Sequence, residues 1–202
     1  MSQVVHVHRD AEGAKTGMWL FLFTEVLLFG ALFLVYAVYR YTYLDDFHRA
    51  AMELNTLFGT INTLILLTSS LTMAMSITAL QKQNKRLSQW LLAITILFAI
   101  AFMVNKYFEW GAKIDHGIYP GSQHLLEMPN GEILFFGLYY FMTGLHGLHI
   151  IIGIVAIAIT MAMIHRDKIT YDYVTILENV GLYWHIVDII WIFLFPLFYL
   201  IK

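Results

Sequence analysis

Five long apolar runs, separated by short polar segments, dominate the pattern of the chain. Each is close to the roughly twenty residues that an α-helix needs to cross a hydrocarbon core about 30 Å thick. The pattern therefore predicts an all-α, polytopic bundle of five transmembrane helices, and we expect the whole chain, 1–202, to form a single membrane domain. The expected helices cover residues 17–39, 57–80, 89–110, 134–163 and 182–201.

The segments between the runs give little room for a soluble domain. Only residues 111–132 form a connection long enough to fold over the membrane surface, and their Gly and Pro residues indicate turns. The first fifteen residues are polar and do not resemble a signal peptide, so the first run is expected to remain in the membrane as a signal anchor.

Composition supports the membrane assignment and removes several function classes. Apolar residues make up 59% of the chain and charged residues 13%, which is unlike a soluble domain. The chain has no cysteine, which excludes disulfides, thiol redox chemistry and thiolate metal sites. No basic run indicates nucleic acid as a partner.

The distribution of Lys and Arg predicts the orientation. With five crossings, the N-terminus and the loops after the second and fourth helices share one side, which holds Arg9, Lys15, Lys82, Lys85, Arg86, Arg166 and Lys168. The opposite side holds Arg40, Arg49, Lys113 and Lys202, with Lys106 near that surface inside the third helix. The positive-inside rule then places the N-terminus in the cytoplasm and the C-terminus outside.

Glu25 lies about two turns inside the first expected helix, where an ionised carboxylate costs on the order of 2.5–3.5 kcal/mol on insertion scales. It therefore needs a partner or a proton. Two interpretations stay open: a functional carboxyl, or a hydrogen bond that assists helix assembly. At the end of the third helix, Lys106 and Glu109 are three residues apart, which predicts a local ion pair.

The fourth helix contains GLHGLH, which places His146 and His149 on one face beside glycines that allow close helix approach. Both are interpreted as hydrogen-bonded core residues. A haem held by two histidines takes them from opposite sides of the ring, so either one would need His185 on the last helix as its partner. This haem interpretation is the less favoured alternative.

The last helix carries its own polar stripe. His185 and Asp188 are three residues apart, and Glu178 lies seven residues before His185 on the same face. Such groups are not tolerated against lipid, so we expect them to meet Glu25 and the fourth-helix histidines inside the bundle. The expected polar seam consists of Glu25, His146, His149, Glu178, His185 and Asp188.

Four stretches carry a resemblance to a known family: GMWLFLFTEVLLFGALF, INTLILLTSSLT, TGLHGLHIIIG and ENVGLYWHIVDIIWIFLFPLFY. They are similar to subunit III of the haem-copper terminal oxidases, best known from cytochrome c oxidase. They lie on four of the five expected helices, in the order of that family, and the last two are specific signatures. The resemblance thus covers nearly the whole chain.

The resemblance implies an accessory subunit without a catalytic centre or cofactor of its own, packed beside subunit I, which is expected to hold haem and copper, and beside other oxidase subunits. It implies bound phospholipid, support for proton uptake into subunit I, and a bacterial plasma-membrane location. Glu25 matches a glutamate that reacts with carbodiimides. The recurrent polar residues of the family match His146, His149, His185, Glu178 and Asp188.

This chain departs from the long form of the family, which has seven helices and a lipid cleft between the first two and the rest. Here the chain begins at what resembles the third helix, as in short bacterial forms, so another chain must complete any such cleft. Accessory subunits of nitric oxide reductases or quinol oxidases share this subunit type and are the alternative functions. A di-histidine membrane haem protein is the third functional hypothesis.

Overall fold

The structure is a computed structural model, and it describes residues 11–171 and 173–201. Five of its helices are long and apolar enough to cross a membrane, which confirms the predicted fold class. In chain order the elements are α1 (Ala11–Thr42), α2 (Leu44–Met52), α3 (Thr56–Gln81), α4 (Lys85–Asp115), α5 (Gln123–Leu126), α6 (Asn130–His165), α7 (Thr175–Phe195) and a C-terminal π-helical turn (Pro196–Leu200).

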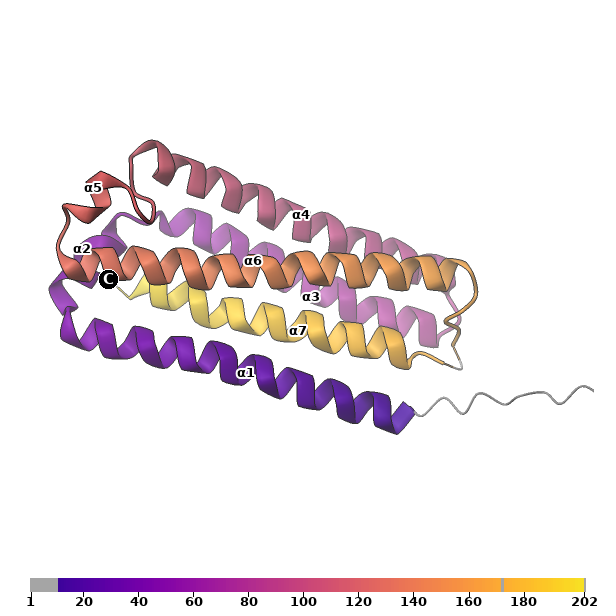
Figure 1. Cartoon of the computed structure of the whole chain (residues 1–202). Helices are drawn as coiled ribbons and strands as arrows, with labels where there is room; N and C mark the ends of the chain where they lie inside the picture. The colour runs from indigo at the N-terminus through magenta and orange to yellow at the C-terminus, as the bar shows by residue number, and fades with distance from the viewer. Residues whose placement is uncertain (1–10, 172, 202) are drawn as a thin grey trace, which may run out of the picture.

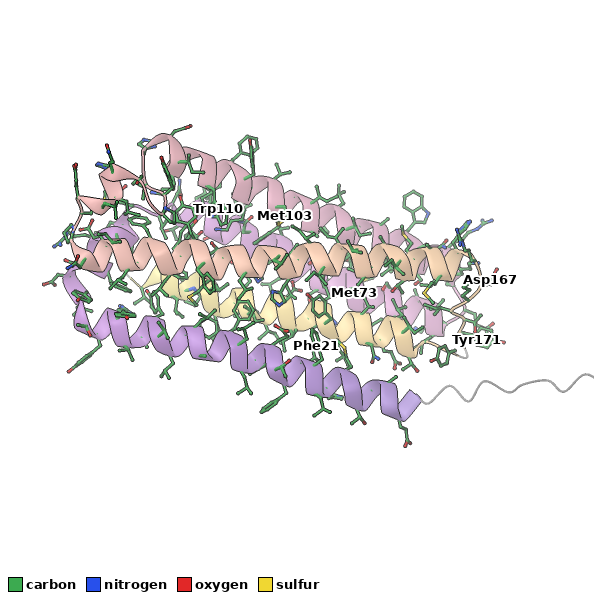
Figure 2. All side chains as sticks on the ribbon, in the orientation of Figure 1. Phe21, Met73, Met103, Trp110, Asp167 and Tyr171 are labelled. Carbon is green, nitrogen blue, oxygen red and sulfur yellow. The ribbon has the colours of Figure 1, made fainter. Side chains whose placement is uncertain are left out.

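The helix α7 lies at the centre of the bundle, packed against α1, α3 and α6 (Figure 1). The helix α4 packs on α3 and α6 at one side, whereas α1 lies at the opposite side. Only 11% of the apolar span of α1 is buried, and its side chains project from the side turned away from the other helices (Figure 2). This helix therefore presents most of its surface to lipid or to a partner.

Ion pairs fix which segments meet at each end of the bundle. At one end, Lys15 lies 2.9 Å from Glu178 and Lys85 lies 2.5 Å from Asp167, so the start of α1 and the loops after α3 and α6 gather there. The described end of the chain lies at the other end, with α2 and α5 (Figure 1). The sides of the loops are as expected, and the cytoplasmic location of the N-terminus stays a prediction. Arg9 and Lys202 lie outside the described residues.

Two short helices that the sequence did not predict cover this second end. The helix α2 buries Phe47, Ala50 and Ala51, and its Asp46 carboxylate accepts a hydrogen bond of 3.2 Å from the Gly131 amide at the start of α6. The helix α5 is a single turn capped by the Ser122 hydroxyl. Both are too short to register as apolar runs.

Hydroxyl groups on α3 dock the buried tryptophans of α7. The indole of Trp184 donates to Ser69 Oγ at 3.1 Å, and that of Trp191 donates to Thr63 Oγ1 at 3.0 Å. These bonds satisfy polar groups in a region without water, as helix packing in a membrane requires. These hydroxyls of α3 therefore hold α7 in place within the bundle.

The close approach of α6 to α7 depends on Gly153. A Cβ atom there would lie 2.7 Å from the ring of the fully buried Trp184. We expect Gly153→Ala to lower the free energy of unfolding by about 1–3 kcal/mol, the usual cost of overpacking, in thermal unfolding of the detergent-solubilised chain.

The matched control for this prediction is Gly137→Ala on the same helix. A Cβ at Gly137 would meet no atom within 4 Å, so the better helix propensity of Ala should leave stability unchanged or raise it by at most about 1 kcal/mol. Equal unfolding temperatures for the Gly153 and Gly137 variants would contradict the proposed close contact.

Candidate functional site

A contact between two titratable side chains, near the middle of both helices, joins α1 to α6. Glu25 Oε2 lies 2.8 Å from His149 Nε2, and the other ring nitrogen, Nδ1, lies 2.8 Å from the Leu145 carbonyl oxygen. The Glu25 side chain is 14% exposed and that of His149 is 9% exposed. The expected contact between Glu25 and a histidine of α6 is confirmed for His149.

The hydrogen bonds of His149 limit its protonation states. A carbonyl oxygen only accepts, so Nδ1 carries a proton and donates it to Leu145. The bond to Glu25 then contains one more proton, held either on Nε2 of an imidazolium or on the carboxyl of a neutral glutamic acid. Because the pair is neutral overall in both states, a membrane can accommodate it and one proton can move within it.

His146 does not join this pair. Its ring stacks on Trp191 at 5.3 Å and meets the edge of Phe102 at 5.6 Å, and neither ring nitrogen has a hydrogen-bond partner among the described residues. The expectation that it is a hydrogen-bonded core residue is therefore wrong, and it is a fully buried histidine between aromatic rings.

The two histidines separate because positions i and i+3 of a helix point roughly 60° apart. The helix α6 is wedged between neighbours, so this angle sends His149 toward α1 and His146 toward α4 and α7. A shared helix face in the sequence thus becomes two different interfaces in the bundle.

The polar residues of α7 also have partners of their own. His185 Nδ1 lies 2.7 Å from Ser70 Oγ of α3, and Glu178 pairs with Lys15 at the end of the bundle. Asp188 is buried beside Ser70, and neither of its carboxyl oxygens has a hydrogen bond of normal geometry among the described residues. The expected continuous polar seam is therefore a set of separate contacts.

A buried polar cluster near the second end of the bundle extends the predicted ion pair. Lys106 Nζ lies 3.1 Å from Glu109 Oε2, and both side chains are less than a tenth exposed. The hydroxyls of Tyr139 and Tyr199 donate to Glu109 Oε1 at 2.8 and 2.5 Å, and Lys106 donates to both hydroxyls. The cluster thus ties α6 and the C-terminal turn to α4.

Sequence reasoning identified the Lys106–Glu109 pair by its spacing but placed it in a local, interfacial setting. The two tyrosines come from other helices, so no spacing within one helix connects them with the pair. The sequence did hold one signal for such partners. Charged residues inside an apolar run require further polar contacts in the membrane, so the Lys106–Glu109 pair indicated that other polar side chains would lie beside it.

The arrangement does not fit a haem clamped between His185 and a histidine of α6. His146 is fully buried between Phe102 and Trp191, which leaves no open face for a haem. Both ring nitrogens of His149 already have partners, while His185 bonds to Ser70 on the side of α7 that faces α3. Within residues 11–171 and 173–201, no three His, Cys, Asp or Glu side chains gather as a metal site would require. The polar contacts of this chain are suited to hydrogen bonding and proton exchange.

Comparison with known proteins identifies relatives that are oxidase subunits. Subunit 3 of a cytochrome c oxidase from Thermostichus vulcanus is 30% identical and aligns over 98% of this chain and 92% of its own length. Subunit 3 of the cytochrome bo(3) ubiquinol oxidase of Pseudomonas putida is 29% identical over 96% of this chain and 88% of that protein. A haem-copper oxidase subunit I+III from Aeropyrum pernix is 29% identical over 93% of this chain, which spans only 22% of that longer protein.

The family model described as cytochrome c oxidase subunit III matches residues 2–202. This range contains all five helices that could span a membrane, together with Glu25, His149, Lys106 and Glu109. The chain belongs to the cytochrome c oxidase subunit III family, whose members are accessory subunits of haem-copper oxidases.

Proposed function

We propose that this chain packs beside subunit I of a respiratory haem-copper oxidase in a bacterial plasma membrane, stabilises that subunit and supports its proton uptake. The observation that carries the proposal is the family match over 2–202, together with a relative that is named as subunits I and III in one chain. In this assignment, oxygen reduction and its haem and copper centres belong to subunit I.

The Glu25–His149 pair supports a role in proton handling. It holds one exchangeable proton in a neutral, partly buried contact on the helix with the most exposed surface. The shared proton can lie on either side chain while the pair stays neutral, whereas a proton gained or lost leaves one net charge that is costly in the membrane. The pair is therefore suited to brief proton exchange beside an uptake path in the neighbouring subunit.

A groove farther along α1 is suited to bind a phospholipid. A groove of about 420 Å³ lies between the second half of α1 and the C-terminal turn. Apolar side chains such as Phe33 and Leu197 line it, and Arg40 lies among them near the end of α1. Apolar walls suit an acyl chain, and a guanidinium suits a lipid phosphate.

Relatives named for cytochrome c and for ubiquinol match this chain with nearly equal identity. The proposed role is the same in both types of oxidase, because electron entry depends on other subunits. A quinol oxidase subunit is thus the second candidate, favoured by the Pseudomonas putida relative.

We expect a hydrophobic carbodiimide to label Glu25 selectively. The reagent enters from the lipid phase and requires a protonated carboxyl, which is one of the two proton arrangements of the pair with His149, on the helix with the most exposed surface. Glu109 should react poorly because Lys106 and two tyrosines enclose it. Mass spectrometry of labelled peptides measures both sites.

The control is Glu25→Gln, which should remove most of the label without changing the oxidase spectrum. Label spread evenly over Glu25, Glu109, Glu178 and Asp188 would contradict a distinct role for Glu25.

A further inference from the structure

The α7 face between α1 and α3 has a polar centre at the depth of the bilayer core. His185 lies about 15 Å along a membrane span of roughly 39 Å, from Thr175 to Leu200. Its ring is partly exposed, and it is flanked along α7 by Leu182 and Ile189, one turn away on either side. The helices α1 and α3 pack on either side of α7.

One ring nitrogen of His185 is satisfied and the other is not. Nδ1 bonds to Ser70 Oγ at 2.7 Å, whereas Nε2 has no partner among residues 11–171 and 173–201 and is not enclosed by them. If Ser70 donates to Nδ1, then Nε2 carries a proton and needs an acceptor. If Nδ1 donates instead, Nε2 needs a donor, so a polar partner is required in either tautomer.

Lipid is a poor occupant of this face. Acyl chains offer no hydrogen-bonding group at this depth, and an unsatisfied polar group in hydrocarbon is strongly disfavoured. Asp188 lies buried beside Ser70 beneath the same face, so the region contains a second polar side chain behind His185. The aliphatic residues around His185 suit the flank of another transmembrane helix. They include Leu67 and Leu71 of α3 and Ile189 and Ile192 of α7, all of them exposed.

We propose that this face, named the His185 face and formed by Ser70, Leu71, Leu182, His185 and Ile189, is where a transmembrane helix of subunit I docks. That helix presents a hydroxyl, amide or other polar side chain to His185 Nε2. The inference rests on the proposed function for the identity of the partner. Its location rests on the unsatisfied nitrogen and on the exposed aliphatic side chains around it.

Site-specific photocrosslinking in the intact oxidase tests the location. A benzophenone amino acid replaces Ile189, which is 49% exposed on the His185 face, or Ile100, which is 46% exposed on α4 at a similar depth. We expect Ile189 to crosslink to subunit I and Ile100 not to do so. Crosslinking of Ile189 to lipid alone or to a second copy of this chain would overturn the proposal, as would equal crosslinking of both positions to subunit I.

Two substitutions at His185 test the hydrogen bond. We expect His185→Leu to release subunit I about threefold to tenfold more readily in a detergent challenge, because an intramembrane hydrogen bond is modest in strength. His185→Gln keeps an amide that can donate or accept and should retain subunit I. Equal retention by the Leu and Gln variants would overturn the role of Nε2.

The same preparations separate this inference from the proposed function. If subunit I copurifies with the unmodified chain but does not crosslink to Ile189, the docking face is wrong and the accessory role stands. If no subunit I copurifies with the unmodified chain, the proposed function fails first.

Discussion

Removing this chain from its oxidase should leave the initial rate of oxygen reduction close to normal and cause the enzyme to inactivate during continued turnover. The initial rate should survive because, under the proposed function, the haem and copper centres belong to subunit I. Inactivation should follow because, under the same proposal, subunit I loses a packed neighbour and a proton-exchanging pair near its uptake path. Oxygen consumption recorded over many turnovers measures both quantities.

Two controls sharpen this experiment. Adding the purified chain back should restore the working life, and adding phospholipid alone should restore part of it if bound lipid contributes. A depleted enzyme that lacks part of its haem spectrum, or that starts at a rate near zero, would show that this chain holds a redox cofactor.

Breaking the Lys106–Glu109 cluster should cost more stability than any surface change. Glu109→Gln leaves the Lys106 ammonium buried without its counter-charge, and it weakens the acceptor of two tyrosine hydroxyls. Breaking a buried ion pair by removing one partner costs about 3–5 kcal/mol in free energy of unfolding. Thermal unfolding in detergent, followed by circular dichroism, should therefore show a large drop in midpoint.

Matched variants separate the buried charge from a general loss of packing. The double variant Lys106→Met with Glu109→Leu removes both charges and should recover much of the stability, because an apolar pair often replaces a buried ion pair without loss. Glu178→Gln, at the Lys15 pair on the end of the bundle, should change the midpoint little. A Glu109→Gln midpoint equal to that of Glu178→Gln would mean that the cluster contributes no special stability.

The helix pattern could be predicted because apolar length is a strong signal in a membrane chain. All five spanning helices were predicted, but the predicted ends stop where the apolar residues stop, whereas the helices continue into the flanking polar segments. For example, α4 begins at Lys85 rather than near Gln89 and continues to Asp115, because helices extend through polar residues into the interface. The short helix α2 escaped prediction because it is held by tertiary contacts of Phe47 and Asp46.

The contacts between helices were harder to predict than the helices. A contact between Glu25 and a histidine of α6 could be predicted from the cost of leaving either group alone, although the sequence did not distinguish His149 from His146. The position of His146 could not be predicted, because the angular offset between positions i and i+3 matters only when neighbours surround α6 on several sides. Tyr139 and Tyr199 reach Glu109 from distant parts of the chain, which no local pattern shows.

Purification of the oxidase through an affinity tag on this chain, followed by separation of the chain from the complex, tests the central claim most directly. The account predicts that a subunit I protein with haem and copper copurifies in fixed proportion. It also predicts that the separated chain has no Soret absorption. A Soret band that stays with the separated chain, or a complex without a haem-copper subunit, would contradict the account.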